Sequence, residues 1–144
     1  MDDRELIAEA IMARQAAYAP YSGFMVGAAL LTGDGRVYRG CNIENAAYSP
    51  TNCAERTAFF SAIADGAREF RAIAVVGAPK GTKREGFAPC FPCGVCRQVM
   101  AEFCAADFRI VTLRGAAESG AGEVISRTLK EQLPDSFSGK NLTL

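Results

Sequence analysis

The sequence predicts an α/β domain in which helices cover a mixed sheet. Three observations support this fold class. Apolar residues recur at helical spacing in three segments, five short runs have the composition of strands, and the two kinds of segment follow one another along the chain. No repeat, linker or low-complexity tract interrupts the 144 residues, so we expect a single domain over residues 1–144.

The amino-terminal part is predicted to form a helix followed by a hairpin. Asp2 or Asp3 can cap the helix, which ends near Arg14. The apolar stripe of this helix consists of Leu6, Ile7, Ala10 and Ile11. Residues 24–31 then form a buried strand and residues 36–41 the return strand, joined by a Gly-Asp-Gly turn.

The remaining chain alternates helices and strands. A polar segment over residues 42–52 leads into a helix over residues 53–65, and Gly66 suits the position just past its end. The later elements are a buried strand over 71–77, a polar loop over 79–88, a helix beginning near Cys93, and strands over 108–113 and 123–127. The connection between the last two strands is too short for a parallel crossover, so we expect them to be antiparallel.

Composition restricts the partners and the compartment. Sixteen basic residues balance sixteen acidic ones, so net charge favours neither nucleic acid nor a membrane surface. No apolar run approaches the length of a membrane span and the first residues do not form a signal peptide, so we expect a cytoplasmic protein. The six cysteines therefore indicate metal ligands or free thiols. Because histidine is absent, hydrolysis would need a carboxylate, a thiolate or a metal-bound hydroxide.

Two cysteine motifs carry the strongest functional signal. Cys53-Ala54-Glu55 and Pro92-Cys93-Gly94-Val95-Cys96 offer three thiolates and one carboxylate. Both motifs fall at predicted helix starts, where free backbone N–H groups and the helix dipole favour thiolates. Three protein ligands leave one position open on a tetrahedral zinc ion, as in catalytic sites. Together with a non-ligand glutamate that moves protons, this pattern is typical of zinc deaminases.

The charge of such a site needs compensation. Three thiolates and one zinc ion carry a net negative charge, which weakens the pull of the metal on bound water. Arg56 or Arg97 could offset this charge by donating hydrogen bonds to the sulfurs. Cys93 and Cys96 project from one helix face, and Cys53 can complete a triangle with them if the two helices lie side by side.

Two other interpretations of the cysteines stay open at this point. Cys-x-x-Cys at a helix start is also a redox signature, although that function requires neither Cys53 nor Glu55. A structural zinc site has four protein ligands, and Cys90 could be the fourth. Cys41 and Cys104 are expected to be ordinary buried or half-buried thiols.

The chain resembles the small zinc-dependent cytidine deaminases over nearly its whole length. Besides the cysteine motifs, residues 19–29 (APYSGFMVGAA) are similar to the opening strand of that family, residues 40–48 (GCNIENAAY) to its nucleoside-binding loop, and residues 133–137 (LPDSF) to its carboxyl-terminal segment. The resemblance implies a three-layer α/β/α fold with a mixed five-stranded sheet. It also implies hydrolysis of cytidine and 2′-deoxycytidine to uridine, deoxyuridine and ammonia in pyrimidine salvage. The alternatives are a related cytosine nucleoside as substrate, or a structural zinc-binding module.

The resemblance also assigns roles to residues. It implies one zinc ion per chain on Cys53, Cys93 and Cys96, with Glu55 as proton shuttle and Arg56 hydrogen-bonded to the sulfurs. It implies a substrate site formed by Phe24, Asn42, Glu44, Ala46, Tyr48, Ala54 and Phe137. Within that site the loop pair Asn42 and Glu44 would bind the ribose, the two phenylalanines would flank the nucleoside, and the backbone at Ala54 would hold the pyrimidine.

The expected assembly is a homotetramer with shared active sites. Phe137 lies in a polar tail, and an aromatic side chain in such a tail needs a surface to receive it. The resemblance implies that this aromatic, and residues near Tyr48, reach the pocket of a neighbouring subunit. A polynucleotide substrate is not expected, because it would require a basic groove with stacking aromatics.

Overall fold

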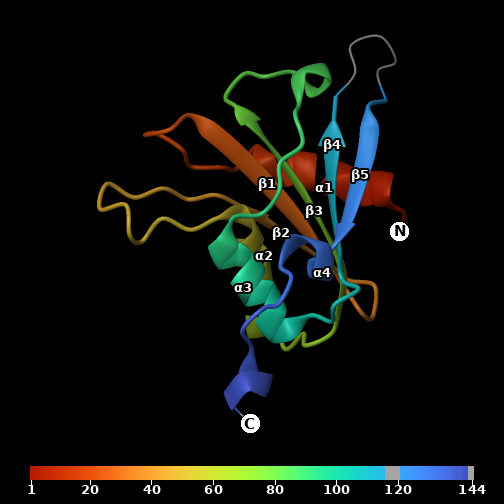
Figure 1. Cartoon of the computed structure of the whole chain (residues 1–144). Helices are drawn as coiled ribbons and strands as arrows, with labels where there is room; N and C mark the ends of the chain where they lie inside the picture. Colours follow the sequence, from red (N-terminus) through yellow and green to blue (C-terminus); the bar gives the residue numbers. More distant parts are fainter. Residues whose placement is uncertain (116–120, 143–144) are drawn as a thin grey trace.

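The computed structural model describes residues 1–115 and 121–142 of the chain (Figure 1). Its helices and strands are α1 (Asp3–Arg14), β1 (Phe24–Thr32), β2 (Val37–Cys41), α2 (Ala54–Ala64), β3 (Phe70–Pro79), α3 (Gly94–Phe103), β4 (Arg109–Arg114), β5 (Glu123–Thr128) and α4 (Leu129–Gln132). Two short 3₁₀ turns, η1 (Arg84–Gly86) and η2 (Gly139–Leu142), complete the described elements. No helix within the described ranges is both long and apolar enough to cross a membrane.

The strands form one mixed sheet in the order β2-β1-β3-β4-β5. β1 pairs antiparallel with β2 and with β3, β3 pairs parallel with β4, and β4 pairs antiparallel with β5. This topology confirms the predicted mixed five-stranded sheet and the antiparallel arrangement of the last two strands. The parallel pair places the carboxyl ends of β3 and β4 at one edge, next to the start of β1.

Helices cover both faces of the sheet, which confirms the three-layer architecture. Figure 1 shows α1 behind the sheet and α2 and α3 in front of it. Side chains alternate between the two layers along each strand. In β3, Ile73 and Val75 belong to the core beneath α2 and α3, whereas Ala74 and Val76 belong to the core beneath α1.

Two glycines allow the helices to approach the sheet closely. A Cβ atom on Gly27 would lie 2.0 Å from the carbonyl oxygen of Ala10 in α1. Gly40 lies in β2 and pairs with Ala28 of β1. A Cβ atom on Gly40 would lie 2.3 Å from the carbonyl oxygen of Ala54 in α2. Each helix therefore rests directly on strand backbone at one point, and the Gly40 contact lies under the first turn of α2.

Three details differ from the sequence prediction. β3 extends to Pro79, and the predicted polar loop over residues 79–88 contains η1. α4 was not predicted, because four residues are too few to show helical periodicity. A capping box between Thr128 and Glu131 stabilises this short helix.

We predict that Gly27→Ala destabilises the fold. The added methyl group must displace the α1 backbone, and such overpacking costs about 1–3 kcal/mol. Urea denaturation should show the loss as a lower midpoint. Gly139→Ala is the matched control, since a Cβ atom there meets nothing within 4 Å. Equal midpoints for the two variants would contradict the close contact between α1 and β1.

Candidate metal centre and substrate site

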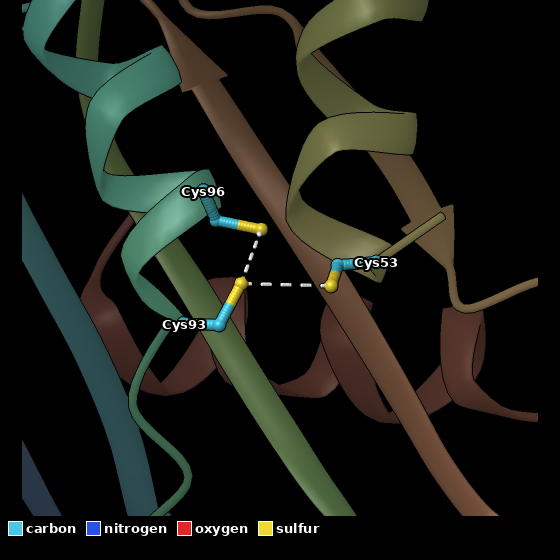
Figure 2. Close-up of side chains that lie close together, drawn as sticks. All are labelled: Cys53, Cys93 and Cys96. Carbon is cyan, nitrogen blue, oxygen red and sulfur yellow. Dashed lines mark hydrogen bonds between the residues drawn. The ribbon is translucent and has the colours of Figure 1, made fainter. Parts of the chain in front are cut away.

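Three cysteine sulfurs meet where α2 and α3 begin. Cys53 is the N-cap residue of α2, Cys93 is the N-cap residue of α3, and Cys96 lies in the first turn of α3. The Cys53 and Cys93 sulfurs are 3.7 Å apart and the Cys93 and Cys96 sulfurs 3.5 Å apart. Figure 2 shows the three side chains pointing toward one another. The two helices thus meet the geometric condition for a shared ligand triangle.

The sulfur triangle has the dimensions of a zinc site. A Zn–S bond of about 2.3 Å in tetrahedral geometry places two sulfur ligands about 3.8 Å apart. The three sulfurs all lie within 4.8 Å of one another, and they are the potential metal-holding group found in the described part of the chain. Three thiolates suit zinc better than a hard cation, which prefers oxygen ligands. The cluster can hold one zinc ion and leaves a fourth position for another ligand.

Glu55 lies beside the cluster in the first turn of α2. Its side chain is buried, with 4% of its surface exposed, and it interacts with the Cys96 side chain. Burial raises the pKa of Glu55 to about 7, and the nearby Cys53 thiolate adds to this effect. A carboxyl group with such a pKa can both accept and release a proton near neutral pH.

Arg56 partly balances the charge of the sulfurs. Its Nη2 donates to the Cys53 sulfur at 3.3 Å. Hydrogen bonding with Cys96 and with Arg56 lowers the pKa of Cys53, which favours its thiolate form. Arg97, the other candidate from the sequence, points elsewhere: its Nη1 donates to the carbonyl oxygen of Gln132 at 3.0 Å. Arg97 therefore links α3 to α4.

The remaining cysteines are not part of the sulfur triangle. Cys90 packs against the core under α2 and α3, and burial raises its pKa to about 12. Its backbone N–H donates to the hydroxyl oxygen of Thr112 at 2.9 Å. Cys41 and Cys104 are half-buried, as expected from the sequence. Burial raises the pKa of all three, which favours the thiol form and suits packing better than metal binding.

The loop after β2 carries four of the implied substrate residues, and the first two, Asn42 and Glu44, form hydrogen bonds that fix the loop. Asn42 clamps this loop to β1: its Oδ1 accepts from the Val26 N–H and its Nδ2 donates to the Phe24 carbonyl, both at 2.8 Å. The Glu44 carboxylate accepts from the Tyr21 and Ser22 backbone N–H groups. The Ser22 hydroxyl also donates to it, and this bond lowers the pKa of Glu44. Asn42 thus holds the loop against the start of β1, and Glu44 holds it against the segment before β1.

A cavity of about 400 Å³ opens at the same loop. Its lining consists of Tyr21, Ser22, Glu44, Asn45, Tyr48 and Thr51. The rings of Tyr21 and Tyr48 meet edge to face with centroids 6.4 Å apart. Tyr48 is 75% exposed and adopts a left-handed backbone conformation, with φ of 58°, which points to a constrained turn. Ala46 lies on this turn and is exposed.

The other implied substrate residues occupy different places. Ala54 is fully buried under the metal cluster, at the contact between α2 and Gly40. Phe24 starts β1 and is 40% exposed, so it is not the core residue that an apolar strand alone would suggest. Phe137 is 59% exposed, and its carbonyl oxygen accepts from the Gln98 side chain at 2.9 Å. In Figure 1 the tail passes α3 and ends below it, away from the loop after β2.

Several residues that shape the site were not singled out in the sequence. Tyr21 and Ser22 hold Glu44, Gln98 holds the Phe137 segment, and Thr112 binds the backbone of Cys90. The Ser22-Gly23 turn before β1 offered a signal for Tyr21 and Ser22, because a serine hydroxyl at a turn often forms hydrogen bonds with nearby residues. The Gln98 and Thr112 contacts join segments far apart in sequence and have no local signal.

A family model for the cytidine and deoxycytidylate deaminase zinc-binding region matches residues 1–112. The chain belongs to this family. A cytidine deaminase of Sporosarcina psychrophila is 50% identical over 99% of this chain and 96% of its own length. One from Halalkalibacterium halodurans is 51% identical over 99% of this chain and 98% of its own.

The fold agrees with that membership. The crystal structure of a cytidine deaminase from Burkholderia pseudomallei superposes with a TM-score of 0.80 at 48% identity, covering 95% of this chain and all of the other. The family is zinc-binding, and the cluster of Cys53, Cys93 and Cys96 is able to hold a metal ion. The deaminase family thus accounts for the open three-sulfur cluster better than a redox or structural site does.

We expect Cys90→Ala to keep one zinc ion per chain and Cys96→Ala to lose it. Cys90 lies outside the sulfur triangle, whereas Cys96 is one of its corners. Metal analysis of the purified proteins, together with thermal unfolding to verify that both fold, measures the difference. Loss of zinc from Cys90→Ala would show a four-ligand structural site instead of an open one.

Proposed function

We propose that the chain is a single domain over residues 1–144 that hydrolyses cytidine and 2′-deoxycytidine to uridine, deoxyuridine and ammonia. One observation carries this proposal: an open triangle of three sulfurs has a buried, proton-accepting carboxyl group, Glu55, beside it. The names of relatives that match almost the entire chain support cytidine as the substrate. We place the reaction in pyrimidine salvage, in the cytoplasm.

In this mechanism Glu55 moves the protons. A zinc ion held by Cys53, Cys93 and Cys96 supplies Lewis acidity and the activation of water near neutral pH. Glu55 accepts a proton from the water that adds at C4 of the ring and passes it to the ring N3. It then transfers the second proton to the 4-amino group, which leaves as ammonia. The pKa of about 7 suits a group that must do both.

The loop after β2 would select a nucleoside over the free base. Glu44 presents a carboxylate in the cavity, which suits ribose hydroxyl groups, and Asn42 lies two residues before it on the same loop. Phe24 would lie against the nucleoside, the backbone at Ala54 would hold the pyrimidine, and Ala46 and Tyr48 would form the outer wall. Binding of the remote sugar can then be used at the reacting carbon, so free cytosine would lose turnover as well as affinity.

Incubation of the purified protein with cytidine tests this function. We expect uridine and ammonia in equal amounts, and slow or no conversion of free cytosine or of cytidine within an oligonucleotide. Efficient conversion of cytosine would contradict the ribose assignment. A protein that holds zinc but leaves all cytosine nucleosides unchanged would favour the structural zinc module.

Glu55→Gln should keep zinc and lose turnover. A general acid–base contributes typically about 10²–10⁴-fold, and the loss should exceed this range because one residue serves several steps. Steady-state assays with cytidine, alongside metal analysis, measure the effect. Glu102→Gln is the matched control, since Glu102 is exposed near the end of α3. Near-normal turnover of Glu55→Gln would mean that another group carries the proton.

We also propose that the active form is a homotetramer in which Phe137 and Tyr48 reach a neighbouring subunit's pocket. In the single chain Phe137 is exposed and held by Gln98, apart from the cavity at the loop after β2. Tyr48 is also exposed on its constrained turn. Two exposed aromatics on separate surfaces suit complementary contacts in a closed assembly.

Hybrid assemblies test the shared site. Glu55→Ala chains and Phe137→Ala chains should each be weakly active alone. When the two are co-expressed, the hybrids should be far more active than the sum of the two variants measured separately. The reason is that a pocket with an intact Glu55 can receive an intact Phe137 from its neighbour. The control is co-expression of Phe137→Ala chains with chains that carry both Glu55→Ala and Phe137→Ala. These hybrids contain no intact Phe137 and should show no gain in activity. A fully active monomer, or hybrids without any gain, would disprove the shared site.

A further inference from the structure

The segment that leads into the metal helix is stiff. It reads Pro89-Cys90-Phe91-Pro92-Cys93. Both prolines have a fixed φ, and the residue before each is restricted to extended conformations. Pro92 is also buried. In a segment with so little rotational freedom, fixing the position of Cys90 largely fixes the position of Cys93, the first sulfur of α3.

Cys90 is fixed by the sheet below it. Within residues 89–92 only Cys90 and Phe91 have a backbone N–H group, because the other two residues are prolines. The Cys90 N–H donates to the Thr112 hydroxyl oxygen at 2.9 Å. The Cys90 sulfur lies over Gly77 of β3, where a Cβ atom would be 2.7 Å from it. One residue thus contacts two neighbouring strands.

Thr112 is well placed to act as this anchor. It lies in β4 on the same face as Ile110, which belongs to the core under α2 and α3. It is fully buried, and a buried hydroxyl is costly unless it forms hydrogen bonds. Thr32, Glu55 and Thr112 are the buried polar residues of the described chain. Thr32 holds a hairpin turn through the Arg36 N–H, so each buried threonine secures backbone.

The geometry points to Thr112 as a positioning residue for the metal centre. Its hydroxyl holds the Cys90 backbone, the proline-flanked segment transmits that position to Cys93, and the sulfur triangle keeps its shape. This inference rests on the proposed zinc site and adds a residue that touches neither metal nor substrate. It also gives Cys90 a role through its backbone N–H and its packing, separate from metal binding.

Zinc release from holoenzyme variants tests the inference. Thr112→Val keeps the shape of the side chain and removes the hydrogen bond, so zinc transfer to a chromogenic chelator should become about tenfold faster or more, as for other residues that support metal ligands. Thr112→Ser keeps the hydroxyl and should release zinc within a few-fold of the unmodified rate. Thr32→Val is the matched control. It removes the hydrogen bond from the Arg36 N–H to a buried threonine hydroxyl at the carboxyl end of β1, and it should lower stability without accelerating zinc release.

A second pair keeps the test valid if Thr112→Val does not fold. Thr112→Ala and Thr112→Ser both lose the methyl group and differ in the hydroxyl alone, so faster release from the alanine variant supports the anchor. Equal release rates within this pair, or equal acceleration by Thr32→Val and Thr112→Val, would overturn it. Failure of the proposed zinc site looks different, because the unmodified protein would then bind no zinc or Cys96→Ala would retain it.

Discussion

The sulfur triangle depends on bringing the amino-terminal ends of α2 and α3 to one point above the sheet. Cys53 and Cys93 are forty residues apart in sequence, yet their sulfurs are 3.7 Å apart. α2 reaches its place because Gly40 lets its first turn rest on strand backbone. α3 reaches its place through a stiff segment held on β3 and β4. Both supports therefore help to set the distance between the sulfurs.

The same arrangement sets the electrostatics of the site. Two helix starts direct their positive ends at the sulfurs, and Arg56 adds a full positive charge at 3.3 Å from Cys53. Glu55 follows Cys53 by two residues and is nevertheless buried, so its carboxyl group stays easy to protonate. The first turn of α2 thus places a stabilised anion, the Cys53 thiolate, beside a destabilised one, the Glu55 carboxylate. Such a contrast is common where protons are transferred.

Much of this could be predicted from the sequence because the signals were local. Helix caps, the hairpin turn, apolar strands and the two cysteine motifs lie within short stretches of chain, and all five strands were expected. The length of the β4–β5 connection was enough to infer its antiparallel pairing.

Features that depend on contacts between distant segments could not be predicted. The charge argument alone could not separate Arg97 from Arg56, and the structure places the Arg97 guanidinium on the Gln132 carbonyl. Thr112, an ordinary threonine in a β-strand pattern, gains its contact with Cys90 from chain packing alone. Phe24 has an apolar sequence context but lies at the first position of β1 and is partly exposed.

The sheet divides the interior into two apolar cores that do not share side chains. Leu6 and Ile7 of α1 belong to one core, whereas Phe59 of α2 and Met100 of α3 belong to the other. Substitutions on opposite sides have no common partners, so their effects on folding free energy should be additive. The α1 side can therefore be redesigned for heat tolerance, by repacking or a better helix surface, with little consequence for the reaction chemistry on the other side. In this molecule robustness and catalysis can be altered separately.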